Sequence, residues 1–174
     1  MDACRASAAG HTFFGVTEHG AAAVVTTTGN PDTHVILRGG RGGPNYEAAP
    51  VAKALDLIAA AGLPRRLMVD ASHGNSGKDH HRQPVVATSV AEQVAAGERG
   101  LTGVMLESFL VEGRQEPGPP HTLTYGQSVT DACMDFGATA AVLAGLAAAV
   151  RTRRTVEAER ARYPPPAIPP AVAG

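Results

Sequence analysis

Three residues able to bind metal ions or anions follow short apolar runs in this sequence. The runs and their polar residues are 34–38 with Arg38, 67–71 with His73, and 103–107 with Glu107. Each run is rich in aliphatic and β-branched residues, which indicates a buried strand of a parallel sheet. Because the carboxyl ends of parallel strands meet at one edge of a sheet, we expect Arg38, His73 and Glu107 to share one site.

The chemistry of that site follows from the residue types. Arg38 precedes two glycines, where a guanidinium often holds an anion, phosphate above all; pairing with a surface carboxylate is the simpler alternative. Taken singly, His73 and Glu107 could each serve a structural hydrogen bond or a helix cap. Taken together, they form a mixed nitrogen and oxygen ligand set suited to Mn, Fe, Co or Zn.

Asp131 is the candidate for a third metal ligand. It follows residues 128–130, Ser-Val-Thr, so a helix N-cap is an almost equally good interpretation. The neighbouring His80 and His81 are weaker candidates. Because adjacent residues on a loop point in different directions, we expect both to be solvated rather than to bind a metal.

Helical and extended patterns alternate along the chain. Helices are predicted at 2–9, 48–61, 84–96 and 138–152, and strands at 12–17, 34–38, 67–71 and 103–107. Residues 21–27 fit either a strand or a helix. Four alternations predict an α/β fold with a parallel sheet, since crossover helices connect parallel strands. A closed eight-stranded barrel typically needs ~250 residues, so the chain is expected to form an open sheet.

Composition limits the classes of partner. The 174 residues are 44% hydrophobic and 18% charged, enough for the core of one domain, with a formal net charge of -1. This balance gives no electrostatic reason to expect nucleic acid or a membrane surface as partner. No run is long and apolar enough to span a membrane and no signal peptide is evident, so the cytoplasm is expected. Cys4 and Cys133 are expected to be free thiols.

Domain organisation is expected to be simple. Residues 1–155 should form the folded domain. Residues 156–174 include two proline clusters and are expected to be a disordered tail.

Six segments carry a resemblance to a known family. They are HVILRGG (34–40), GPNY (43–46), VDASHGNS (69–76), GVMLES (103–108), VEG (111–113) and YGQSVTDAC (125–133). In order and spacing they resemble the type I 3-deoxy-D-arabino-heptulosonate 7-phosphate (DAHP) synthases. The resemblance covers residues 1–154 and corresponds to the C-terminal half of that family's barrel, so it implies a partial TIM barrel of about four β/α units.

The resemblance implies a function and roles for four residues. DAHP synthases condense phosphoenolpyruvate with erythrose 4-phosphate at the entry to the shikimate pathway. Arg38 matches the arginine that holds the phosphate of phosphoenolpyruvate. His73, Glu107 and Asp131 match three ligands of the catalytic divalent metal.

The departures from the family pattern leave two functions open. The family's fourth metal ligand, a cysteine, has no counterpart, and the basic loops that complete both phosphate sites are absent. The chain is therefore either part of a DAHP synthase, expected to form a homo-oligomer or to pair with an N-terminal half, or a non-catalytic module that binds an anion and a metal. In isolation it is expected to have little or no synthase activity.

Overall fold

The centre of the molecule is a sheet of three parallel strands. The computed structural model describes residues 1–162, in which β3 (Val35–Leu37), β4 (Leu67–Asp70) and β5 (Leu101–Met105) pair in the order β3-β4-β5. The register aligns Leu37 with Val69 and Val69 with Val104. The carboxyl ends of the three strands therefore lie at one edge, as the sequence predicts.

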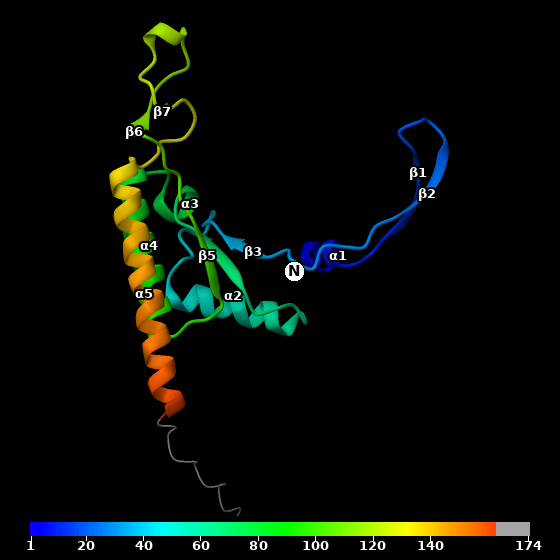
Figure 1. Ribbon diagram of the computed structural model, residues 1–174, viewed down its shortest axis with the longest axis horizontal. Helices are drawn as coiled ribbons and strands as arrows, with labels where there is room; N and C mark the ends of the chain where they lie inside the picture. The colour runs from blue at the N-terminus through cyan, green and yellow to red at the C-terminus, as the bar shows by residue number, and fades with distance from the viewer. Residues whose placement is uncertain (163–174) are drawn as a thin grey trace, which may run out of the picture.

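Two helices make the crossovers between these strands and cover the sheet. α2 (Ala48–Ala60) connects β3 to β4, and α4 (Gln83–Ala96) connects β4 to β5 (Figure 1). The two helices pack their apolar faces against the central strand to form the core. Its fully buried members include Val51, Leu55, Ile58, Leu67, Val69, Val86 and Val90. This core fixes the strand ends from which the candidate site residues project.

A long final helix packs along α4. This helix, α5 (Phe136–Arg162), contributes Ala149 to the core, and the ribbons of α4 and α5 run side by side (Figure 1). It is longer than the predicted helix at 138–152 and passes the predicted domain boundary at 155, so residues 156–162 are helical. The rest of the predicted tail, 163–174, lies outside the described residues.

The first predicted strand forms but does not join the parallel sheet, which corrects the expectation of four parallel strands. β1 (Thr12–Val16) pairs antiparallel with β2 (Ala22–Thr26) in a separate hairpin. The hairpin and the helix α1 (Asp2–Ala8) form an arm that extends away from the body (Figure 1). Residues 21–27 thus adopt the extended alternative. The sequence pattern identified a strand, but strand pairing is decided by residues distant in sequence.

Several short elements that the sequence did not predict follow β4 and β5. The segment after β4 contains α3 (His73–Ser76) and the 3-10 turn η1 (His80–Arg82). The segment after β5 contains β6 (Val111–Arg114), the 3-10 turn η2 (Pro120–Thr122) and β7 (Gln127–Ser128), with β6 and β7 paired in parallel. These elements carry or neighbour the candidate site residues.

Two further expectations can be compared with the described residues. Cys4 and Cys133 are both free thiols, as predicted. Within residues 1–162, no helix is long and apolar enough to cross a membrane.

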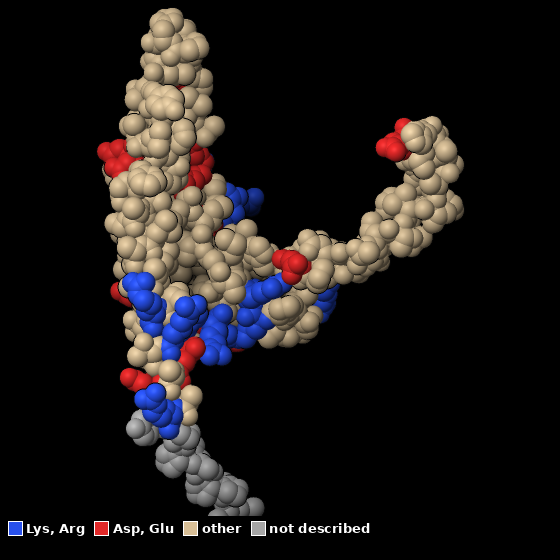
Figure 2. Space-filling model, viewed as in Figure 1, with Lys and Arg blue, Asp and Glu red and all other residues tan. Residues whose placement is uncertain are grey.

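Figure 2 shows Lys and Arg gathered near the end of the molecule where α5 finishes, away from the end that carries β6 and β7.

Candidate metal centre

His73, Glu107 and Asp131 converge at the carboxyl edge of the sheet. His73 begins α3 after β4, Glu107 follows β5, and Asp131 lies between β7 and α5. The Nε2 atom of His73 lies 3.7 Å from Oε1 of Glu107 and 4.0 Å from Oδ2 of Asp131. One ligand atom from each residue lies within 4.8 Å of those of the other two. The structure thus brings the three predicted ligands together.

Asp70 fixes the orientation of the His73 ring. Its Oδ2 lies 2.6 Å from Nδ1 of His73, and its Oδ1 accepts hydrogen bonds from the backbone and hydroxyl of Ser72. The Asp70 side chain is only 2% exposed, so the contact is sheltered from water. A neutral imidazole held in this way carries its proton on Nδ1 and presents the Nε2 lone pair to the two carboxylates.

That arrangement fits a cation. Distances of 3.7 and 4.0 Å are too long for hydrogen bonds from His73 to Glu107 or Asp131. A lone pair facing two carboxylates is electrostatically unfavourable unless a positive charge lies between them. Histidine nitrogen and carboxylate oxygen are ligands that first-row divalent metals accept. The donor set, together with the Asp70 contact behind His73, therefore fits a divalent metal.

Gln83 positions Glu107 from the first turn of α4. The residue is 1% exposed. Its Oε1 accepts a hydrogen bond from the Glu107 N–H at 2.8 Å, and its Nε2 donates to the Glu107 carbonyl at 3.2 Å. Both backbone groups of Glu107 are therefore satisfied by one buried amide. Such double pairing holds the start of the loop after β5 in a single position.

Asp131 is held by backbone pairing of its neighbours. Cys133 and Gly113 exchange two hydrogen bonds, and the Met134 N–H donates to the Glu107 carbonyl. This ties the 131–134 segment to the loop after β5. The alternative that Asp131 caps a helix is wrong, because α5 begins at Phe136 and Asp135 accepts the hydrogen bond from Ala138 N.

Lys78 adds a positive charge next to Asp131. Its Nζ lies 3.4 Å from both carboxylate oxygens of Asp131, and it is the one non-glycine residue with positive φ, 64°, among residues 1–162. Burial raises the pKa of the Glu107 carboxyl. Asp131 and Asp70 raise it further, whereas His73 and Lys78 act in the opposite direction. The surplus of carboxylates at this point is the electrostatic feature that a metal ion would relieve.

Arg38 lies at the same edge but outside the three-residue cluster. It follows β3 and its side chain is exposed. Gly39, with φ 72°, packs so closely on the residue after His73 that a Cβ there would lie 2.5 Å from the Gly74 carbonyl carbon. Asn75 also donates to the Leu37 carbonyl, at 3.0 Å. The loops after β3 and β4 are therefore joined, and Arg38 is fixed at its backbone next to the site.

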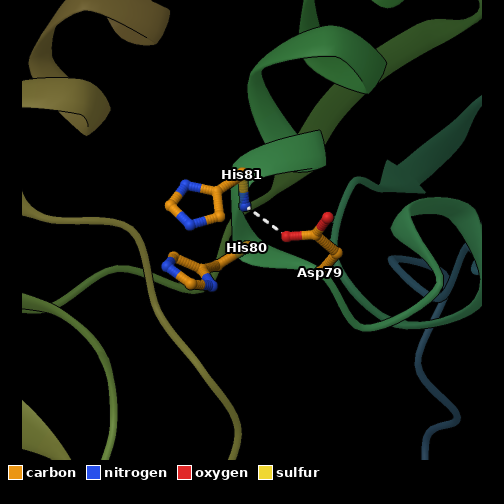
Figure 3. Close-up of side chains that lie close together, drawn as sticks. All are labelled: Asp79, His80 and His81. Atoms are coloured by element: carbon orange, nitrogen blue, oxygen red, sulfur yellow. Dashed lines mark hydrogen bonds between the residues drawn. The ribbon is translucent and has the colours of Figure 1, made fainter.

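His80 and His81 do not point in different directions, which corrects the prediction from sequence. Their rings lie next to each other at a tilt, with centroids 3.9 Å apart and planes inclined by 36° (Figure 3). His81 is exposed and His80 half-buried. Together with Asp79 they form a second group of potential metal ligands, separate from His73, Glu107 and Asp131.

Sequence reasoning missed three residues that position the centre. They are Asp70, Lys78 and Gln83. Asp70 lies within β4, and the other two lie further along the chain, so none of them occupies the position just after a strand from which ligands were predicted. Asp70 offered a signal. It ends an apolar run predicted to be a buried strand, and a buried aspartate is rare unless it has a partner, here His73 three residues later. Lys78 and Gln83 offered none, since their partners lie 53 and 24 residues away.

The chain is similar in sequence to known enzymes. It is 51% identical over 158 residues to the tyrosine-inhibited phospho-2-dehydro-3-deoxyheptonate aldolase of Schizosaccharomyces pombe, across 88% of this chain and 42% of that relative. It is 47% identical over 154 residues to the Phe-sensitive enzyme of the same name from Escherichia coli K12, across 88% of this chain and 44% of the relative. The chain spans less than half the length of these curated relatives.

The fold and a family profile agree with that similarity. The solved structure of phospho-2-dehydro-3-deoxyheptonate aldolase from Francisella tularensis SCHU S4 matches with a TM-score of 0.80 and 42% identity, over 88% of this chain and 44% of that one. The profile described as the DAHP synthetase I family matches residues 1–144. The resemblance to type I DAHP synthases is therefore confirmed, and the chain belongs to the DAHP synthetase I family.

Proposed function

We propose that this chain supplies the metal-binding part of a DAHP synthase, which condenses phosphoenolpyruvate with erythrose 4-phosphate. The observation that carries the proposal is the convergence of His73, Glu107 and Asp131, in a chain of this family, with Asp70 holding the His73 ring. His73 would bind through Nε2 and the other two through carboxylate oxygens. The donor set suits Mn, Fe, Co or Zn.

The residues of this chain prepare the site for an aldehyde substrate. Asp70 keeps the His73 proton on Nδ1, and Gln83 fixes the Glu107 backbone. A divalent metal held there would supply Lewis-acid polarisation of the erythrose 4-phosphate carbonyl. Such help accelerates the reaction only when the reacting groups are held in register, so the hydrogen bonds behind the ligands matter as much as the ligands.

Arg38 is the proposed ligand for the phosphate of phosphoenolpyruvate. Its strand places it one residue beyond Leu37, which pairs with Val69, so Arg38 lies level with Asp70 at the edge that carries the metal ligands. Its guanidinium is exposed and free to form a two-pronged contact with phosphate oxygens. One arginine is a weak site for a doubly charged phosphate, and further cations from outside this chain are expected to complete it.

We also propose that the parallel sheet is part of a (β/α) barrel completed by an N-terminal half. Within residues 1–162, β3 and β5 each pair with β4 alone, so each has a free edge. The similarity of this chain to less than half of a solved phospho-2-dehydro-3-deoxyheptonate aldolase supports this arrangement. The completing half would supply the missing metal ligand and the remaining phosphate contacts.

The test is a reconstitution assay. The chain is incubated with Mn²⁺, phosphoenolpyruvate and erythrose 4-phosphate, alone and with the N-terminal half of the Escherichia coli relative. The expected result is tight Mn²⁺ binding by the chain alone, which is lost in His73→Ala, together with synthase activity only in the mixture. Metal binding without turnover in either case would favour the non-catalytic alternative. Metal binding unchanged in His73→Ala would reject the assigned centre.

A further inference from the structure

A second group of metal-ligating side chains lies outside the centre described above. Asp79, His80 and His81 are consecutive residues at the start of η1, just before α4 (Figure 3). One potential ligand atom from each lies within 4.8 Å of the others. The group shares no residue with His73, Glu107 and Asp131, and the proposed synthase function does not use it.

The local backbone holds these three side chains in a defined arrangement. Asp79 accepts a hydrogen bond from the His81 N–H through Oδ1 at 3.0 Å, and the Arg82 N–H donates to the Asp79 carbonyl at 3.0 Å. The turn therefore closes on itself and leads directly into α4. This geometry brings the two imidazole rings close together, with centroids 3.9 Å apart, although adjacent residues on a loop usually point in different directions.

The donor atoms are available. Within residues 1–162, the ring nitrogens of His80 and His81 have no hydrogen-bond or ion-pair partner, and Oδ2 of Asp79 has none either. Asp79 and His81 are exposed and His80 is half-buried, so an ion can approach from solvent. The rings are thus not engaged in a structural role that metal binding would disrupt.

The distances fit a metal after small side-chain movements. Zinc bonds of ~2.0 to 2.2 Å place tetrahedral ligand atoms roughly 3.3 Å from one another. The three ligand atoms already lie within 4.8 Å of one another, and rotation about the χ angles of the side chains can bring them to that spacing. Two imidazoles and one carboxylate are a donor set that Zn²⁺, Co²⁺ and Ni²⁺ accept, with water in the remaining positions.

We propose that Asp79, His80 and His81 form a second binding site for a divalent transition-metal ion such as Zn²⁺. The site is weaker than the centre at His73, because its donors are exposed and no buried carboxylate orients either ring. One ligand of the first centre, His73, lies on the same segment after β4 as the three residues of the second site. The chain therefore binds two metal ions with different affinities.

The experiment is a Zn²⁺ titration of the full 174-residue chain, without an affinity tag, in competition with a chromophoric chelator. The wild-type chain is expected to bind two ions. The double variant His80→Ala/His81→Ala should retain only the tighter one, and His73→Ala only the weaker one. His19→Ala, which removes an exposed histidine on the hairpin arm, is the control and should still bind two.

Asp79→Asn separates binding from folding. Asparagine is as good an N-cap as aspartate, so the turn is retained while the charged ligand is lost. We expect the affinity of the second site to fall about ten-fold, with an unchanged circular dichroism spectrum. A stoichiometry of one ion in the wild type, or two ions in the folded His80→Ala/His81→Ala variant, would overturn the proposal.

Discussion

At the scale of single residues, the proposed metal centre depends on how His73 is held. Asp70 contacts Nδ1 of His73 at 2.6 Å and is itself fixed by Ser72. Replacing Asp70 with Asn removes the charge that selects the Nδ1 proton. We expect metal affinity to fall about 10- to 100-fold, as for other loss of carboxylate support behind a histidine ligand. Calorimetric titration with Mn²⁺ measures the change, and the exposed Asp56→Asn on α2 is the control.

Lys78 has the opposite influence on the same centre. Its ammonium lies 3.4 Å from the Asp131 carboxylate and repels a bound cation. A lysine held at φ 64° also stores backbone strain, which is typical of positions fixed by their surroundings. We expect Lys78→Met to bind Mn²⁺ about five-fold more tightly, measured in the same titration. Lys53→Met, on an exposed face of α2, should not change it; weaker binding in Lys78→Met would show instead that Lys78 orients Asp131.

The proposed metal ligands could be predicted from sequence, whereas most of the residues that position them could not. His73 and Glu107 follow strands, and the rule that parallel strands end at one edge was enough to group them. For Asp131 the sequence left a helix N-cap as an almost equally good interpretation, and the resemblance to the family favoured the metal ligand. Gln83 sits at a helix start and resembles many polar residues there. Its role depends on being buried against Glu107, which only the packed structure defines.

At the scale of elements, Gln83 connects the start of α4 to the end of β5. Gln83→Leu would leave the Glu107 N–H without a partner and remove one of the two hydrogen bonds to the Glu107 carbonyl, at a cost of about 2 kcal/mol in the free energy of unfolding. Metal affinity should fall as well, because the Glu107 backbone is released. Urea unfolding and metal titration measure the two effects. Gln93 lies on the same helix and donates a hydrogen bond to the Tyr46 carbonyl. Gln93→Leu loses this bond and should lower stability without weakening metal binding.

The opposite end of the sheet is held by an ion pair between Arg65 and Glu98. Burial alone would raise the pKa of the Glu98 carboxyl, but hydrogen bonds from Arg65 and the Gly100 backbone outweigh burial and lower the pKa. A carboxyl with a lowered folded-state pKa stabilises the fold above its unfolded pKa. That stability is lost as the pH falls through the folded-state pKa.

Glu98→Gln tests this pair. Because Arg65 is 43% exposed, we expect a loss of only about 0.5 kcal/mol in unfolding free energy at pH 7. The difference from wild type should shrink as the pH falls below the unfolded-state pKa of a glutamate, about 4.3, and through the lowered pKa of the folded state. Urea unfolding at pH values from neutral down into this acidic range is the measurement. Glu112→Gln on β6 is the control, and a difference that stays constant as the pH falls would contradict the explanation.

The hairpin shows that sequence patterns can predict a strand without predicting which strand it pairs with. Residues 12–17 have the composition of a strand, and β1 does form there. The residue pattern of 12–17 predicts a strand but does not show which other strand it pairs with. The turn at Gly20, with φ 78°, allows the chain to return at once and pair with residues 22–26. The same local preference is therefore satisfied by a hairpin rather than by the parallel sheet.

At the scale of the whole molecule, the chain leaves large apolar side chains uncovered. On the hairpin arm, Phe13 is 51% exposed, Phe14 91%, Val16 70% and Val24 64%. Two-stranded hairpins are only marginally stable in water by themselves. The sheet also has free edges at β3 and β5 within the described residues. Exposed apolar patches and unpaired strand edges both promote association between chains.

We therefore expect the isolated chain to self-associate, and the arm to contribute to this. Phe14 and Val24 are cross-strand partners on one face of the hairpin, so Phe14→Ser/Val24→Ser removes most of its apolar surface without changing the pairing of the strands. Light scattering after size-exclusion chromatography should give a multiple of the 17.8 kDa chain mass for the wild type and a lower mass for the variant. Tyr125→Ser, at a position 89% exposed outside the arm, is the control and should behave as wild type. A wild-type chain that runs as a stable monomer would show that these surfaces do not drive association, and robust synthase turnover by that monomer would show that the chain needs no completing half.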